Sequence, residues 1–434
     1  MGRRTARGHA QGECSRRRIL EATLEIAARR GYDGTTVARV TEATGLPASS
    51  IYWHFGSKDE LLADVLEHSF REWRPAVASW TEAPDDGDRV EQLEKRVRGA
   101  ITSTTRQPEF WRLGVMLGLE KRPREPAARR RFLEVRVEVQ QHIADWWRLA
   151  PGAQRLGDDL DLQCLLAQLT LAWLDGLFVA AQTDPGLGVA ADRLARIVAR
   201  GLDVMADEVP VLARSRAVRA APAPRPEPGP PPASGRDRIL LAAAEVAAER
   251  GYQGTSISRI CARAGLPASS LYWAYKDKDD LLAAVVRHSY DEWRAGQPAL
   301  EPITAGAPWA DALRSWLTSS FVGLEESPNF LRIGHMLGLN QTDASPAGRD
   351  LFLAVRQHAR DMIAEWFTDV LHPDLVRRDP DLAPLLSRLI MAFGDGLFLG
   401  LQLDTPRWDP PLAAEVLVLM LEAAVAVATE RLAA

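Results

Sequence analysis

The chain has 434 residues, of which 46 % are hydrophobic and 26 % are charged, and its net charge is −5. This length suits two to four domains, and the composition is typical of a folded globular protein and excludes a disordered or fibrous one. The acidic balance argues against a protein that is coated in nucleic acid over its whole surface.

The sequence gives two indications of the compartment. No window approaches the roughly 18 consecutive apolar residues that span a bilayer, and the arginine-rich start is not followed by an apolar signal core. We therefore expect a cytoplasmic protein with no membrane partner. Cys14, Cys164 and Cys261 are widely separated and have no metal or redox spacing, so we expect reduced structural thiols, with a redox role for Cys14 as the less favoured alternative.

The first 30 residues are basic, with eight arginines against three glutamates. Such an arm ahead of a helical domain can bind phosphates or enter the minor groove, or it can be a solvated run of charge. Ser15 can cap a first helix with Ile19 and Ile26 on one face, and Gly31 stands where a helix end favours a left-handed residue.

The next elements have the spacing of a helix-turn-helix. Thr36 offers a cap for a short second helix that Gly45 stops, and Pro47 opens a third helix that runs to Phe55. Ser57 then begins a capping box for a fourth helix. Two short helices joined by a tight glycine turn are the geometry that places the second helix in the major groove of DNA.

Helical periodicity divides the third helix into two faces. Ile51 and Phe55 lie four residues apart and are expected to anchor it to the core. The other face is small and polar apart from one indole, and small residues allow the backbone to approach base edges. We predict groove contacts from Ala48, Ser49, Ser50 and Trp53, and phosphate contacts from Thr36, Tyr52, His54 and Lys58. A generic helical hairpin with one exposed aromatic is the alternative.

This stretch occurs twice. GLPASSIYWHFGSKDELL begins at Gly45, and GLPASSLYWAYKDKDDLL begins 220 positions later at Gly265. The same displacement relates the DGLF motifs that begin at Asp175 and Asp395. So long a period indicates a duplicated two-domain unit and not a solenoid. In the second copy the DNA-binding candidates are Ser256, Ala268, Ser269, Ser270, Tyr272, Trp273, Lys276 and Lys278.

The two copies differ where phosphate contacts are expected. Ala274 replaces His54, and Lys276 is the candidate replacement contact. Residues 35–68 carry a local charge of −3, whereas residues 255–288 carry +2. Because the first copy has the arginine arm, we expect both copies to bind phosphate by different means.

Five further helical stretches follow in the first unit, broken near Pro108, residues 151–157 and Asp184, and their equivalents recur in the second. The proline-rich segment between the units predicts an extended spacer of about 3.1 Å per residue. Asp175 and Asp395 lie inside apolar helical runs, so each is expected to have a partner or to cap a helix end. The expected domains are two DNA-binding domains (1–56 and 236–276), two helical effector-binding and dimerisation domains (57–210 and 277–434) and the linker 211–235.

The duplicated motif resembles the DNA-binding signature of the tetracycline-repressor (TetR) family of bacterial transcriptional regulators. The resemblance rests on Thr35-Thr36, Gly45-Leu46-Pro47, and the pattern from Ile51 through His54 and Lys58 to Leu61. It implies an all-α fold in which each of two tandem units has a three-helix DNA-binding domain and a helical ligand-binding and dimerisation domain. It also implies that the last two helices of each unit form a four-helix interface, so we expect an intrachain pseudo-dimer, with a larger assembly of chains as the alternative.

The resemblance further implies a sequence-specific regulator, most simply a repressor that a small molecule releases from an approximately palindromic double-stranded DNA operator. The 13 tryptophans favour an apolar or aromatic effector, although aromatic stripes are often ordinary core. The candidate effector residues are Trp111, Met116, His142, Trp146, Trp173, His335, Met336, His358 and Trp366.

Two other functional classes compete with a regulator. A helical scaffold or ligand-binding protein that has lost DNA binding would show decay of the groove-facing residues in one copy, which is not seen. An enzyme is less favoured, because the sequence has no phosphate-binding glycine loop, HExxH motif, nucleophile elbow or paired cysteines. We expect no metal and no cofactor.

Overall fold

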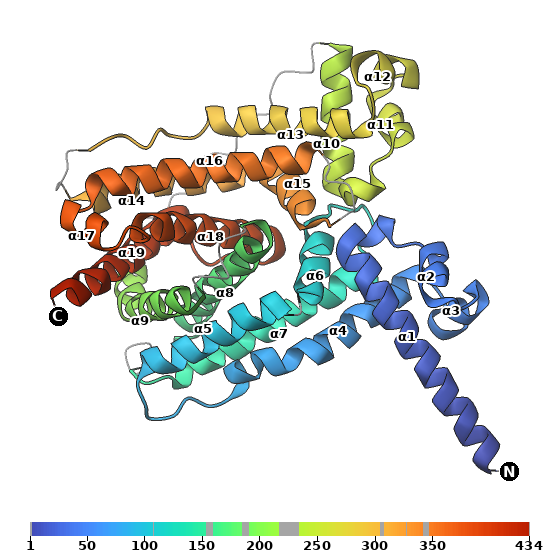
Figure 1. Ribbon diagram of the computed structural model, residues 1–434, viewed down its shortest axis with the longest axis horizontal. Coiled ribbons are helices and arrows are strands. Elements are labelled where there is room, and N and C mark those ends of the chain that lie inside the picture. The colour runs from blue at the N-terminus through green and yellow to red at the C-terminus, as the bar shows by residue number, and fades with distance from the viewer. Residues whose placement is uncertain are drawn as a thin grey trace.

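The protein is described here by a computed structural model in which two units of similar helix order lie in one chain (Figure 1). Within the described ranges every regular element is a helix, which confirms the all-α prediction. The described residues are 2–106, 108–152, 159–184, 191–216, 234–303, 308–326, 328–341 and 347–433.

The first predicted DNA-binding domain, head 1, consists of α1 (Gly2–Gly34), α2 (Val37–Thr44) and α3 (Ala48–Phe55). Gly31 interrupts α1 with a φ of 68°, at the position where the sequence predicts a helix end. The Thr36 side chain accepts a hydrogen bond from the Arg39 amide, and Gly45 closes α2 with a φ of 65°. Local capping therefore positions α3 as the sequence predicts.

The second predicted DNA-binding domain, head 2, repeats this arrangement. It consists of α10 (Gly235–Gly254), α11 (Ile257–Ala264) and α12 (Ala268–Ala274). Ser234 and Asp237 form a reciprocal capping box at the start of α10, and Ser256 caps α11. In Figure 1 both heads lie at the end of the molecule away from the C-terminus.

Two predicted boundaries were wrong. Helix α1 begins at Gly2 and not at Ser15, because the arginine- and alanine-containing arm has no proline to stop a helix. Helix α9 (Ala191–Arg216) continues through Pro210 into the predicted linker, since the next proline comes only at Pro222. The remainder of the predicted linker, 217–233, lies outside the described residues.

The helical domain of each unit follows its head. Unit 1 has α4 (Lys58–Thr81), α5 (Arg89–Arg106), α6 (Glu109–Leu119), α7 (Ala127–Leu149), α8 (Leu160–Thr183) and α9. Unit 2 has α13 (Lys278–Ala295), α14 (Trp309–Glu326), α15 (Pro328–Leu339), α16 (Ala347–Val370), α17 (Pro373–Arg378), α18 (Leu382–Leu403) and α19 (Pro410–Ala433). The shorter α13 is the counterpart of α4, and residues just after its end line a cavity in unit 2.

The units pack on each other through α8 with α18 and α9 with α19 (Figure 1). Trp173 of α8 stacks on Phe393 of α18 with 4.8 Å between ring centroids, and its Nε1 lies 3.2 Å from the Met420 sulfur of α19. A continuous apolar core therefore runs through both units.

Three helices are apolar and long enough to cross a membrane by length and composition alone: α8, α18 and the Pro410–Thr429 part of α19. This corrects the expectation that no stretch approaches that limit, which gave too much weight to isolated polar residues such as Asp175. In the most apolar window of each helix, 83 %, 78 % and 56 % of the residues are buried inside the protein. Packing inside the protein, within and between the units, thus accounts for much of this apolar composition.

The heads also contact each other and the opposite unit. Helix α1 packs on α10. The Lys121 amide of unit 1 donates to the Ala248 carbonyl of head 2 at 2.9 Å, and the Gln341 amide of unit 2 donates to the Arg29 carbonyl of head 1 at 3.1 Å. Each helical domain is therefore hydrogen-bonded to the head of the other unit.

Candidate nucleic-acid interface and ligand cavity

The third helix of each head presents two large aromatic side chains to solvent, a tyrosine (Tyr52 or Tyr272) and a more exposed tryptophan. Ile51 and Phe55 of α3 are buried, as predicted. Their counterparts in head 2, Leu271 and Tyr275, are buried as well. Trp53 is 79 % exposed and Trp273 is 91 % exposed. Because burying an indole is strongly favourable, two fully presented indoles at equivalent positions suit a surface that is covered by a partner.

The predicted DNA-binding residues are exposed or half-buried on each head and at the start of the helix that follows it. Half-buried members are Ser50, His54, Lys58, Ser256, Ser270 and Lys278, and the remaining members are exposed. His54 lies edge-on to Trp53 with 4.7 Å between centroids. Burial, together with the nearby Arg16 charge, lowers the pKa of His54, which favours the neutral imidazole as a hydrogen-bonding group.

The lysine at the start of the fourth helix is held by a tyrosine in both heads. Lys58 Nζ lies 4.3 Å from the Tyr32 ring centroid, and Lys278 Nζ lies 4.0 Å from that of Tyr252 and donates to its carbonyl at 3.2 Å. Burial lowers the pKa of both lysines. The sequence reasoning missed these tyrosines, although the repeated Gly-Tyr pair beginning at Gly31 was a signal for them.

Fewer positive side chains of head 2 are free than a count of its charged residues suggests. Arg263 forms ion pairs with Glu245 at 2.9 Å and Glu249 at 2.8 Å, so part of the local positive charge is neutralised within the head. Lys276 is exposed at the turn before α13. Arg16 of head 1 pairs with Asp64 of α4 at 2.6 Å.

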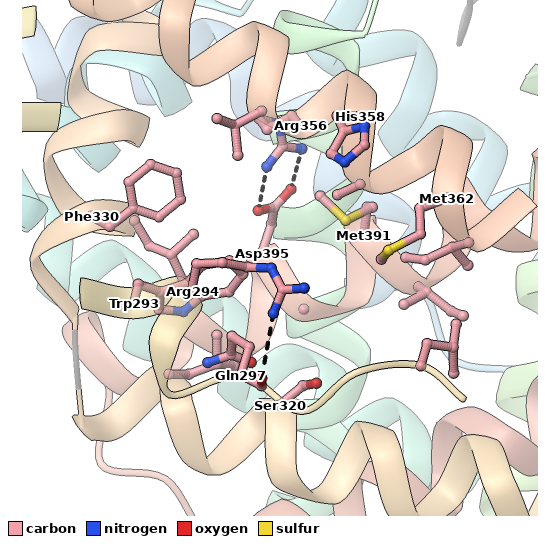
Figure 2. Close-up of a pocket in the computed structure, with 18 of the residues that line it drawn as sticks. Trp293, Arg294, Gln297, Ser320, Phe330, Arg356, His358, Met362, Met391 and Asp395 are labelled. Atoms are coloured by element: carbon pink, nitrogen blue, oxygen red, sulfur yellow. Dashed lines mark hydrogen bonds and ion pairs between the residues drawn. The ribbon is translucent and has the colours of Figure 1, made fainter. Parts of the chain in front are cut away.

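Unit 2 contains a large cavity between α13, α14, α16 and α18 (Figure 2). Its empty volume is about 1120 Å³, including space open to solvent. The wall is mostly apolar and aromatic, and a few polar groups interrupt it, as is usual for sites that bind small organic molecules. Trp293, Trp316, Phe330, Met362 and Met391 contribute apolar surface, and Arg294, Gln297, Ser320 and His358 contribute polar atoms.

A buried ion pair forms the floor of this cavity (Figure 2). Arg356 donates two hydrogen bonds to Asp395, at 2.7 and 2.6 Å, and His335 Nε2 lies 2.9 Å from Asp395 Oδ1. Burial alone would raise the pKa of Asp395, but Arg356 and His335 outweigh it and hold this pKa at about 2. The carboxylate predicted to need a partner therefore has two.

The equivalent aspartate of unit 1 is held differently. Asp175 lies 2.9 Å from Arg136, which also binds Asp404 of unit 2 at 2.6 Å. Burial raises the pKa of Asp175 to about 6, although Arg136 opposes this shift. Arg136 thus joins the two units, whereas its counterpart Arg356 is bound within its own.

The predicted effector residues are spread over several places. His358 lines the cavity, and His335 lies below its floor. Trp111 and Trp146 are buried in the core of unit 1, Trp173 lies between the units, and His142 is exposed. Trp366 donates to the Glu301 carbonyl at 2.9 Å, while Met116 and Met336 line a small space beside Gly31 and Gly251.

Known proteins resemble the heads most closely. The family model described as bacterial regulatory proteins, tetR family, matches residues 19–65 and again 239–285. The HTH-type transcriptional regulator SrpR of Pseudomonas putida is 27 % identical over 163 residues, which cover 38 % of this chain and 72 % of that protein. TtgR of Pseudomonas putida, also an HTH-type transcriptional regulator, is 33 % identical over 81 residues, or 19 % of this chain and 38 % of TtgR. The repressor AcnR of Corynebacterium efficiens is 47 % identical over 47 residues, which cover 11 % of this chain and 25 % of AcnR.

Proposed function

We propose that this chain, a member of the tetR family of bacterial regulatory proteins with two family units in tandem, is a cytoplasmic transcriptional repressor that a small molecule releases from DNA. The observation that carries DNA binding is the pair of equivalent recognition helices, α3 and α12, each with an exposed indole above a buried anchor. In a protein that had lost DNA binding, the same exposed residues would not be expected on both α3 and α12.

The operator is approximately palindromic. The groove-facing residues Ala48, Ser49, Ser50 and Trp53 are identical to their counterparts in α12, so the two half-sites have similar sequences. Half-sites read by a symmetric pair lie one helical turn apart, at about 34 to 36 Å. The two phosphate-contacting surfaces differ, since Ala274 replaces His54, and one half-site is therefore held more strongly than the other.

One chain supplies both DNA-binding heads. The contacts of α8 with α18 and of α9 with α19 support an intrachain pseudo-dimer, because in two-fold family dimers equivalent helices come from two chains. Light scattering should then give the mass of one chain, 47.8 kDa. A stable dimer of chains would favour the larger assembly instead.

The cavity of unit 2 supports control by a small apolar or aromatic effector. Cavities of this composition bind organic molecules, and binding that favours one arrangement of the heads shifts DNA affinity by a coupling of typically about 1 to 3 kcal/mol. No catalytic activity is assigned, because the related proteins are transcriptional regulators.

Selection of operators from random DNA by the full-length chain tests this function. The expected product is a duplex with two related half-sites, bound at nanomolar concentration and more weakly as salt increases. Replacing both Trp53 and Trp273 by alanine should abolish selection, whereas Val137→Ala, at an exposed apolar site on α7, is the control. Selected operators with unrelated halves would contradict the palindromic arrangement, and failure to enrich any sequence would contradict DNA binding.

A further inference from the structure

We propose that one chain binds one effector molecule, in unit 2 only, and that this effector is an uncharged, largely apolar molecule with one hydrogen-bonding group. The inference rests on the proposed function as a regulator and specifies its ligand site. It follows from a comparison of the two units at equivalent positions, which differ by 220 in residue number.

The first difference is the length of the helix that follows each head. In unit 2, α13 ends at Ala295, and the chain continues outside a helix past Gln297, Pro298 and Leu300, all of which line the cavity. In unit 1, α4 continues to Thr81 and carries Trp80 in the place of Leu300. Trp80 is 2 % exposed and lies edge-on to Trp146, with 5.6 Å between centroids.

The second difference is the size of the side chains that face the same space. Leu331 lines the cavity in unit 2, but Trp111 takes its place in unit 1. Trp111 is buried, and its ring lies 5.3 Å from that of Trp73 and 5.5 Å from that of Phe132. The indole therefore occupies volume that leucine leaves open.

One further exchange adds side-chain volume to the same space in unit 1. Leu174 replaces Gly394, so a four-carbon side chain stands where unit 2 has only a hydrogen atom. The side chains of unit 1 therefore fill the volume that is empty in unit 2.

The polar atoms of the cavity indicate the chemistry of the ligand. Among the described lining residues Asp395 is the one carboxylate, and both of its oxygens are bound by Arg356. A cationic ligand would therefore find no available counter-charge, and burying its charge would be costly. Arg294 is exposed at the rim, where solvent screens its charge.

Three of the lining residues carry a buried polar atom that remains for a hydrogen bond. Ser320 Oγ, Trp293 Nε1 and Arg356 Nε have no hydrogen-bond partner among the described residues. An uncharged ligand with a hydroxyl or carbonyl group, whose oxygen can accept a hydrogen bond, would satisfy one or more of them. At the position of Ser320 unit 1 has Ala100, which offers no side-chain hydrogen bond.

Binding of the neutral fluorescent probe N-phenyl-1-naphthylamine to the full-length chain tests the proposal. The expected stoichiometry is one probe per chain. Gly394→Leu, which copies unit 1, should weaken binding at least tenfold. A Cβ at Gly394 would lie 3.9 Å from Phe321, an ordinary contact, so the backbone has no need to move.

Leu331→Trp provides a second variant if Gly394→Leu fails to fold, as judged by circular dichroism. The matched control is Leu174→Met in unit 1, which should leave the probe affinity of unit 2 unchanged. Two equal sites per chain, or wild-type binding by either folded unit 2 variant, would overturn the proposal. Operator binding is measured on the same samples. Loss of operator binding would count against the proposed function as a regulator, whereas the number of probe molecules per chain would still show whether unit 2 alone binds the effector.

Discussion

Gly176 of α8 lies directly against the backbone of Ala392 in α18. A Cβ added at Gly176 would come within 1.7 Å of the Ala392 carbonyl oxygen, and one at Gly396 within 1.7 Å of the Ala172 carbonyl oxygen. The reciprocal contacts bring the two helix backbones together at the centre of the pairing between units. Only glycine permits this approach at either position.

Gly176→Val should therefore weaken the pairing of the units. Forcing a side chain into a closely packed contact costs typically about 1 to 3 kcal/mol, and here the obstacle is backbone that cannot rotate away. Urea unfolding measures the loss. Gly99→Ala is the control, because nothing lies within 4 Å of its Cβ and alanine raises helix stability by up to about 1 kcal/mol. An unchanged midpoint for Gly176→Val would show that the helices do not approach so closely in solution.

Lys58→Ala and Lys276→Ala should each reduce the salt dependence of operator binding. If each lysine neutralises one phosphate, the slope of log K against log salt should fall by about 0.9. Fluorescence anisotropy at several salt concentrations measures the slope. Arg263→Ala supplies the contrast, because Glu245 and Glu249 already neutralise this arginine within head 2. Equal changes for all three variants would refute these phosphate contacts.

Glu120 should make the protein less stable as the pH rises. Burial raises its pKa to about 7, although Arg122 donates to it at 2.6 Å, and its counterpart in unit 2 is Asn340. The folded state thus keeps a proton that the unfolded chain releases near pH 4.3, so this contribution is complete below about pH 4 and is lost as the pH rises through about 7.

Glu120→Gln should remove that dependence. The free energy of unfolding of the variant should improve relative to wild type by up to about 3 kcal/mol between pH 5 and pH 8, as measured by denaturant titration at each pH. Glu91→Gln, on the exposed face of α5, controls for the loss of one carboxyl group. A constant difference between Glu120→Gln and wild type would rule out the buried, protonated carboxyl.

The two buried aspartates should respond unequally to the same substitution. Asp395→Asn leaves Arg356 buried without a carboxylate, which typically costs about 3 to 5 kcal/mol. Asp175→Asn should cost less at pH 7, because Arg136 keeps Asp404 as a partner. The low pKa of Asp395 further predicts that its stabilisation is present above about pH 4 and is lost as the pH falls towards 2. Equal losses in thermal unfolding would contradict the unequal pairing.

The heads could be predicted from the sequence in detail because they depend on local signals. The caps at Thr36 and Ser57, the left-handed glycines at positions 31 and 45, and the buried pair of Ile51 and Phe55 each act within a few residues. Local hydrogen bonds and helical periodicity are sufficient to specify such features. The roles of the exposed side chains on DNA stay predictions.

The cavity could not be predicted in this way. Its existence depends on where α13 ends and on the size of side chains such as Gly394 and Leu331, which come from different helices. Tryptophan was a poor guide, because Trp111 and Trp146 fill the core of unit 1 and Trp173 packs between the units. A difference between the repeats, small residues in one and large ones in the other, was the informative signal.

Covalent fusion gives this protein a freedom in evolution that a homodimer lacks. In a homodimer one gene specifies both subunits, so every mutation occurs twice and a change that suits one side must also be tolerated on the other. Here Arg136 reaches across to Asp404 while Arg356 binds Asp395 in its own unit. Selection can therefore act on one half at a time, so that sensing can be lost from one repeat and kept in the other without a second gene.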